Sequence, residues 1–189
     1  MMHRFDAADL TRQLDALPIE ARVAFALACA ERLAGYSSRP DDSQTRELAQ
    51  AARELARQSL AGASIAPEAL GTLAARLESL PDIDDDDVAA CAYVLECLRT
   101  GAVQAAVAAA ERAYDARERV AEKGLLFSVY TPEIEAALLA DPRIQAELAY
   151  QRADLESLGR EPRSHLLIVD RARDSQSEPG QRAGARGDR

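Results

Sequence analysis

The sequence is short of the residues on which much enzyme chemistry depends. It has no tryptophan, two histidines and a single lysine, Lys123. His3 and His165 stand near opposite ends of the chain, and neither has a second ligand at a spacing such as His-Glu-x-x-His. The chain also lacks the Gly-x-Ser-x-Gly nucleophile elbow and the glycine-rich loops that bind nucleotides. We therefore expect no cofactor and no metal.

Cysteine and long apolar runs are equally sparse. The three cysteines, Cys29, Cys91 and Cys97, include no Cys-x-x-Cys pair and lie inside apolar helical patterns. An odd number of thiols in such places indicates small buried side chains in a reducing compartment. The first ten residues contain no apolar signal core, and no run approaches 18 apolar residues. These features predict a cytoplasmic protein that does not enter a membrane.

Alanine and leucine at helical spacing make up most of what remains. Alanine, with 40 residues, is the best helix former. Apolar residues recur every three or four positions in eight segments, which predicts a compact all-α antiparallel bundle of about seven or eight helices. We expect one helical domain over residues 1–160, a short extended segment at 161–170, and a disordered Arg- and Gly-rich tail at 171–189.

Acidic residues outnumber basic ones, and the imbalance is concentrated in the body of the chain. The formal net charge is −9, and residues 1–170 carry −11 because residues 171–189 carry +2. A nucleic-acid-binding protein would show a basic face instead. The charge permits a basic protein partner, since opposite charges raise association rates. Solubility is the favoured explanation of the charge.

Five aspartates stand in the six positions from Asp82 to Asp87, just before an apolar run. A calcium loop of the EF-hand type needs glycine at its sixth position and glutamate at its twelfth, and no register of this segment supplies them. A helix N-terminus, in contrast, attracts aspartates because its N–H groups are unpaired and its dipole is positive there. The run therefore predicts the start of a helix, with contact to a partner as the next alternative and a metal site as the weakest.

One segment carries a resemblance to a known family. The stretch FALACAERLAGY resembles a signature of the bacterial domain of unknown function 416 family, carried here by Phe25, Cys29, Glu31, Arg32 and Tyr36. Other matching features are a preceding Leu-Pro pair, the acidic segment before an alanine-rich helix, and a proline-started last helix with Gln145, Glu147, Gln151 and Leu155 in similar places. The resemblance implies an all-helical cytoplasmic fold and no established reaction.

Two interpretations fit the signature. Glu31 and Arg32 are adjacent and point about 100° apart on a helix, so each must meet a neighbouring helix or solvent. The first interpretation is an interhelix salt bridge at one end of the bundle. The second is a partner-binding rim; tyrosine and arginine are typical interface anchors. That candidate rim comprises Glu31, Arg32, Tyr36, Asp84, Asp85, Asp86 and Asp87.

The leading hypothesis for function is a non-catalytic interaction protein. Some small helical families of this kind resemble immunity proteins, which suggests an immunity protein or antitoxin whose acidic face covers a basic toxin domain. The alternative is an enzyme whose site is made of carboxylates and the Glu31–Arg32 pair, with or without a metal; it would need two or more carboxylates converging on a pocket. A structural homo-oligomer, suggested by the alanine-rich segment after Gly101, is a third hypothesis. The sequence does not determine the oligomeric state.

Overall fold

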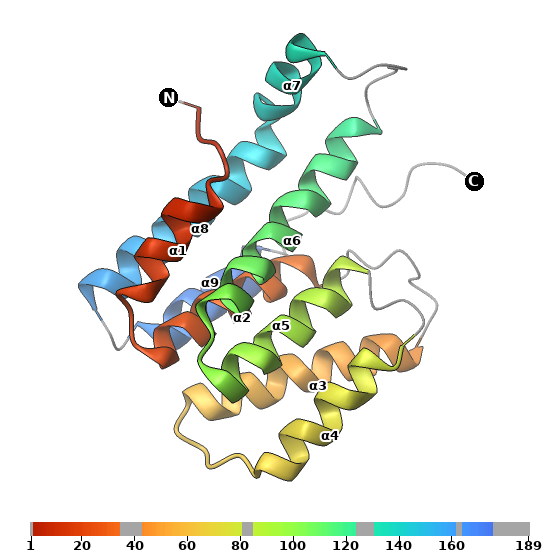
Figure 1. The fold of residues 1–189 in the computed structure, drawn as a ribbon, viewed down its shortest axis with the longest axis vertical. Coiled ribbons are helices and arrows are strands. Elements are labelled where there is room, and N and C mark those ends of the chain that lie inside the picture. The colour runs from red at the N-terminus through yellow and green to blue at the C-terminus, as the bar shows by residue number, and fades with distance from the viewer. Residues whose placement is uncertain (1, 35–42, 81–84, 124–130, 162–163, 176–189) are drawn as a thin grey trace.

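The computed structural model describes residues 2–34, 43–80, 85–123, 131–161 and 164–175. Within these ranges every regular element is an α-helix, as the sequence predicts. α3 and α4 lie at one end of the molecule and α7 at the other (Figure 1). The nine helices of the described chain are α1 (Ala7–Asp15), α2 (Ile19–Leu33), α3 (Ser43–Leu60), α4 (Pro67–Glu78), α5 (Asp86–Thr100), α6 (Val103–Glu122), α7 (Pro132–Leu139), α8 (Pro142–Arg160) and α9 (His165–Ser175).

Local signals start and end several helices where the sequence predicts. Thr131 and Asp141 each precede a proline at the first position of a helix, α7 and α8. Their side chains accept hydrogen bonds from the backbone N–H groups of Ile134, at 3.4 Å, and Arg143, at 2.8 Å. These bonds satisfy donors that have no partner within the helix. Gly101 ends α5 with φ of 70°, a left-handed conformation that glycine adopts without steric penalty.

Helix α2 is the centre of the fold because it is apolar on nearly every side. All its residues from Val23 to Leu33 are buried. A helix of this kind must be covered all round, and α2 packs against α3, α5, α6, α8 and α9. Its many alanines allow these neighbours to approach closely. As a result Glu31 and Arg32, which stand in the last turn of α2, are carried into the interior.

Two hydrophobic clusters hold the helices together. The larger one surrounds α2 and reaches the end of α8 and α9. The smaller one, around Leu138, Ile144 and Leu148, packs α7 and the first half of α8 against the end of α6. The inner face of α8 that joins the two clusters is polar, since Glu147, Gln151 and Asp154 are buried there.

The end of the described chain differs from the sequence prediction. Residues 161–170 were expected to be extended and residues beyond them disordered, yet His165–Ser175 form α9. The helix buries Ile168, Val169 and Ala172, which are three and four positions apart and so share one helical face, and α9 packs on α2. The predicted extended connector at 125–130 and residues 176–189 of the predicted tail lie outside the described residues. No helix in the described part of the chain is long and apolar enough to span a membrane.

Candidate functional site

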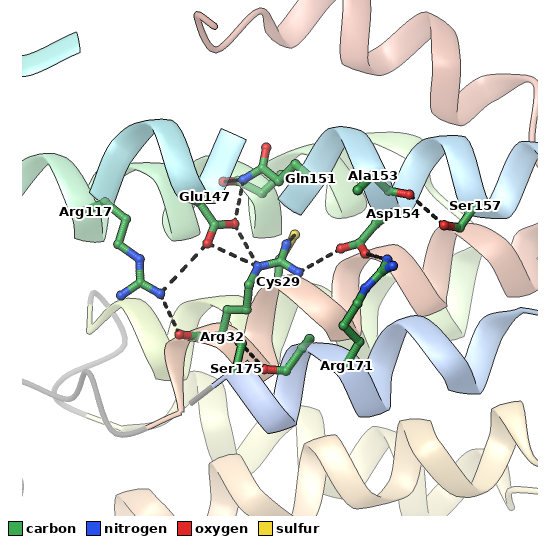
Figure 2. A network of polar contacts seen from close by, with 12 residues as sticks. Cys29, Arg32, Arg117, Glu147, Gln151, Ala153, Asp154, Ser157, Arg171 and Ser175 are labelled. Atoms are coloured by element: carbon green, nitrogen blue, oxygen red, sulfur yellow. Dashed lines mark hydrogen bonds and ion pairs between the residues drawn. The ribbon is translucent and has the colours of Figure 1, made fainter. Parts of the chain in front are cut away.

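Arg32 is the centre of a buried ionic network between α2 and α8 (Figure 2). Its Nε lies 3.0 Å from Oε1 of Glu147, and its Nη1 lies 2.7 Å from Oδ2 of Asp154. The Arg32 side chain is 2% exposed and each carboxylate side chain is 1% exposed. The two carboxylates stand seven residues apart, two turns of α8, and the planar guanidinium spans them. The interhelix salt bridge predicted for this residue is therefore confirmed.

Three further polar side chains complete this network. Gln151 donates a hydrogen bond from Nε2 to Oε1 of Glu147 at 3.0 Å. Arg117 donates to the backbone carbonyl of Arg32 at 2.9 Å and lies 3.9 Å from Glu147. Arg171, from α9, donates to Oδ1 of Asp154 at 2.5 Å. Each buried carboxylate thus faces two arginines, which offsets the high cost of removing the charges from water.

Burial keeps the cysteine of the signature in its thiol form. Cys29 Sγ lies 3.3 Å from Nη2 of Arg32. Burial nevertheless raises the pKa of Cys29 strongly, and Arg32 opposes this only in part because Glu147 and Asp154 are also close. A nucleophilic cysteine needs a lowered pKa and access to solvent, and Cys29 has neither. Burial disfavours the charged form of Arg32, but the negative charges of Glu147 and Asp154 outweigh this effect and raise the pKa of Arg32 above its ordinary value.

Glu31 points to another side of α2 from Arg32, as their adjacency requires. Its Oε1 accepts a hydrogen bond at 2.6 Å from Nη2 of Arg57 on α3. The same guanidinium lies 3.1 Å from Oδ1 of Asp170 on α9. Arg57 therefore ties three helices together, and Glu31, 6% exposed, is a structural ion-pair partner in this arrangement.

The aspartate run begins α5, as predicted, but its side chains turn inward. Asp85 is the N-cap and accepts a hydrogen bond from the backbone N–H of Asp87 at 3.2 Å. Asp86 pairs with Arg119 and lies 3.8 Å from Arg112, both on α6. All three of these aspartates are buried, and Asp87 pairs with an arginine of α3. The capping interpretation of this run is confirmed for Asp85.

These positions correct the predicted partner-binding rim. Glu31, Arg32 and Asp85–Asp87 are at least nine-tenths buried, so they do not form a surface rim. The physical reason is that α2 is covered on all sides and the start of α5 packs against arginines of α3 and α6. Tyr36 and Asp84, the other two members of the rim, lie outside the described residues.

Sequence reasoning missed several members of the network. Asp154 and Arg117 had no role in the sequence analysis, and Gln151 entered only through the resemblance. One signal was present: Glu147, Gln151 and Asp154 follow each other by four and three residues, on the same stripe as the apolar residues of α8. Polar residues on a buried stripe indicate a buried polar network.

The network has the carboxylates of an acid–base site but not its geometry. Glu147 and Asp154 converge on the guanidinium of Arg32, and neither lines either of the two described cavities. Among the described residues no group of three or more His, Cys, Asp or Glu side chains is placed to hold a metal ion.

A different surface carries unpaired negative charge. Glu111, Asp115, Glu118 and Glu122 lie four, three and four residues apart on α6 and so share one face; we call them the acidic ridge. None of the four forms an ion pair with another described residue, and the two neighbouring arginines of α6 turn to Asp86 instead. Partial burial, followed by the charge of Glu111, raises the pKa of Asp115 to about 6. The ridge is thus a surface on which like charges repel each other.

The comparisons with known proteins bear on the fold. No protein-family model and no curated protein matches this sequence. Its structure matches the crystal structure of a DUF416 family protein from Shewanella baltica OS155 with a TM-score of 0.68. The chain has the fold of that DUF416 family protein. The match covers 87% of this chain and 91% of the other at 18% identity. The sequence resemblance to this family is therefore confirmed at the level of the fold.

Proposed function

We propose that this protein is a non-catalytic interaction protein that binds a basic protein partner through the acidic ridge of α6. The observation that carries the proposal is the row of four carboxylates along one face of α6, none of which forms an ion pair with another described residue. Burial, followed by the charge of Glu111, raises the pKa of Asp115 to about 6, which agrees with this crowding of negative charge. Like charges one helical turn apart destabilise a helix. A cationic partner would remove this repulsion, so the ridge favours association with positive charge.

The ridge replaces the rim expected from the sequence as the proposed binding surface. Among the described residues of the rim, Glu31, Asp86 and Asp87 already pair with arginines inside the fold and Arg32 pairs with carboxylates. A binding protein could use these charges only by breaking those pairs. Glu111 is exposed, and Asp115, Glu118 and Glu122 are partly exposed, so these carboxylates are accessible to a partner. Glu118 also accepts a hydrogen bond from the hydroxyl of Tyr114 at 3.2 Å.

The sharper form of the proposal is an immunity protein or antitoxin that covers a basic toxin domain. Such a role needs complementarity and affinity but no chemistry. The alternative, an enzyme with a carboxylate site, is supported less well because the convergent carboxylates Glu147 and Asp154 are neutralised by arginines.

Affinity capture followed by matched variants tests the proposal. The tagged protein is captured from the cytoplasm of its source cell, and any stoichiometric partner is identified by mass and purified. Its affinity is then compared for wild type, for a variant with all four ridge residues changed to the corresponding amides, and for the control Glu47→Gln/Glu54→Gln. Glu47 and Glu54 are exposed on α3, away from the ridge.

We expect the ridge variant to bind at least tenfold more weakly, and added salt to weaken wild-type binding more than that of the variant. The control should bind like wild type. A basic partner whose affinity is unchanged by the ridge substitutions would overturn the proposed surface. Failure to recover any specific partner would overturn the proposed function.

A further inference from the structure

A cavity of about 320 Å³ lies between the N-terminal segment, α1 and α8. Its N-terminal wall is held in place by a reciprocal pair of hydrogen bonds. The backbone N–H of His3 donates to Oε1 of Gln145, and Nε2 of Gln145 donates to the carbonyl of His3, both at 2.8 Å. Phe5 stacks on Tyr114 of α6, with 5.3 Å between ring centroids. The cavity is therefore bounded by anchored elements.

The cavity has an apolar floor and a size suited to a small ligand. Leu10 and Leu148 are buried beneath it, and Phe5 and Leu155 are half-buried at its sides. The other eight of its twelve lining residues are polar or charged, so the lining suits a ligand that has both an apolar and a charged part. Cavities that bind small molecules begin at about 300 Å³. Volume and lining together admit one ligand about the size of an amino acid.

Gln151 supplies a hydrogen-bond acceptor at this cavity. The residue is 5% exposed and lines the cavity. Its Nε2 donates to the carbonyl of Ala110, at 3.1 Å, and to Glu147. Its Oε1 has no hydrogen-bond donor among the described residues, and Figure 2 shows this oxygen turned away from Glu147. This oxygen is free to accept a hydrogen bond from an N–H group of a ligand in the cavity.

Charges of both signs surround the opening. Arg152 forms no ion pair with any described residue; its Nη1 lies 3.4 Å from Nε2 of His3. On the α1 side stand the carboxylates of Asp6 and Asp9. Hydrogen bonds from Arg12 and Gln13, together with the nearby charge of Arg152, hold the pKa of Asp9 below its ordinary value, so Asp9 is a carboxylate at neutral pH.

We propose that this cavity binds a zwitterionic α-amino acid with an apolar side chain. The ammonium group donates to Oε1 of Gln151 and faces the carboxylates of α1. The ligand carboxylate pairs with Arg152, which can bind it through two N–H groups. The side chain lies on the leucine floor. A ligand with only one of the two charges would leave either Gln151 or Arg152 without its partner.

Titration of the full chain with defined probes tests this inference. Isothermal calorimetry is run with L-leucine and L-phenylalanine, with 4-methylpentanoate, which lacks the ammonium group, and with isopentylamine, which lacks the carboxylate. We expect at least one amino acid to bind, and both analogues of leucine to bind at least tenfold more weakly than leucine if leucine is that ligand. For phenylalanine the matched analogues are 3-phenylpropionate and phenethylamine.

Two variants with the same charge change provide the control. Arg152→Gln should weaken amino-acid binding at least tenfold, and Arg173→Gln, at an exposed arginine of α9, should leave it unchanged. The inference is overturned if neither amino acid binds at millimolar concentration, if the singly charged analogues bind equally well, or if Arg152→Gln has no effect. The acidic-ridge variant should keep amino-acid binding, so this result is independent of the proposed protein partner.

Discussion

Replacing Arg32 by methionine should destabilise the protein strongly, because it leaves two carboxylates buried in the interior. Glu147 and Asp154 are each 1% exposed and lie 3.0 and 2.7 Å from the guanidinium. Removing one partner of a buried ion pair costs about 3–5 kcal/mol. Arg171, 2.5 Å from Asp154, and Arg117, 3.9 Å from Glu147, remain. We therefore expect a loss near the lower limit, about 3 kcal/mol.

Urea unfolding followed by far-UV circular dichroism measures this loss. A domain of this size is stable by about 5–15 kcal/mol, so the variant should still fold. With a denaturant slope of about 2–3 kcal/mol/M, the midpoint should fall by about 1–1.5 M. The matched control is Arg99→Met, which removes an exposed pair with Glu96 and should change stability by less than about 1 kcal/mol.

A second substitution separates lost charge pairing from lost packing. Adding Glu147→Gln to the Arg32→Met variant removes one of the uncompensated charges, and should restore about 1 kcal/mol. If Arg32→Met costs no more than Arg99→Met, or if the added Glu147→Gln destabilises the protein further, the buried ion network is not what fixes α8 to α2.

Three further predictions concern other sites. Because the pKa of Asp115 is raised to about 6, the folded state binds a proton more tightly than the unfolded state, and the contribution of Asp115 to stability falls as pH rises from about 4 to about 6. Asp115→Asn should remove this pH dependence and stabilise the protein at pH 7 by about 1 kcal/mol after solvent screening. If the variant is less stable than wild type in urea at pH 7, the raised pKa of Asp115 is contradicted. Gly101→Ala should lower stability by about 1–2 kcal/mol because φ is 70° and the new Cβ would lie 2.9 Å from Ile19 Cδ1, whereas Gly71→Ala, in open helix, should raise the melting temperature. The three buried cysteines should react with a thiol reagent only when the protein unfolds, because burial shields them and raises their pKa values, that of Cys97 to about 11. Rapid labelling of the folded protein would contradict this prediction.

The sequence by itself determined the fold class and most helix boundaries. These boundaries follow from local hydrogen bonding and sterics, which the sequence shows directly. The local signals are the leucine and alanine spacing, the proline at the first position of α4, α7 and α8, the caps Thr131 and Asp141, and the turn at Gly101. The burial of all three cysteines also followed from their apolar surroundings.

Only the tertiary structure decided which charged residues are inside. Arg32 and Asp154 are 122 positions apart in the sequence, and no helical period indicates that α8 lies across α2. The same holds for α9: the sequence predicted an extended segment there, whereas the surface of α2 buries one face of a helix. For Asp85–Asp87 the sequence predicted the start of a helix, with contact to a partner as the alternative. Arginines brought from α3 and α6 pair with two of them instead, because a buried carboxylate is stable only beside a cation.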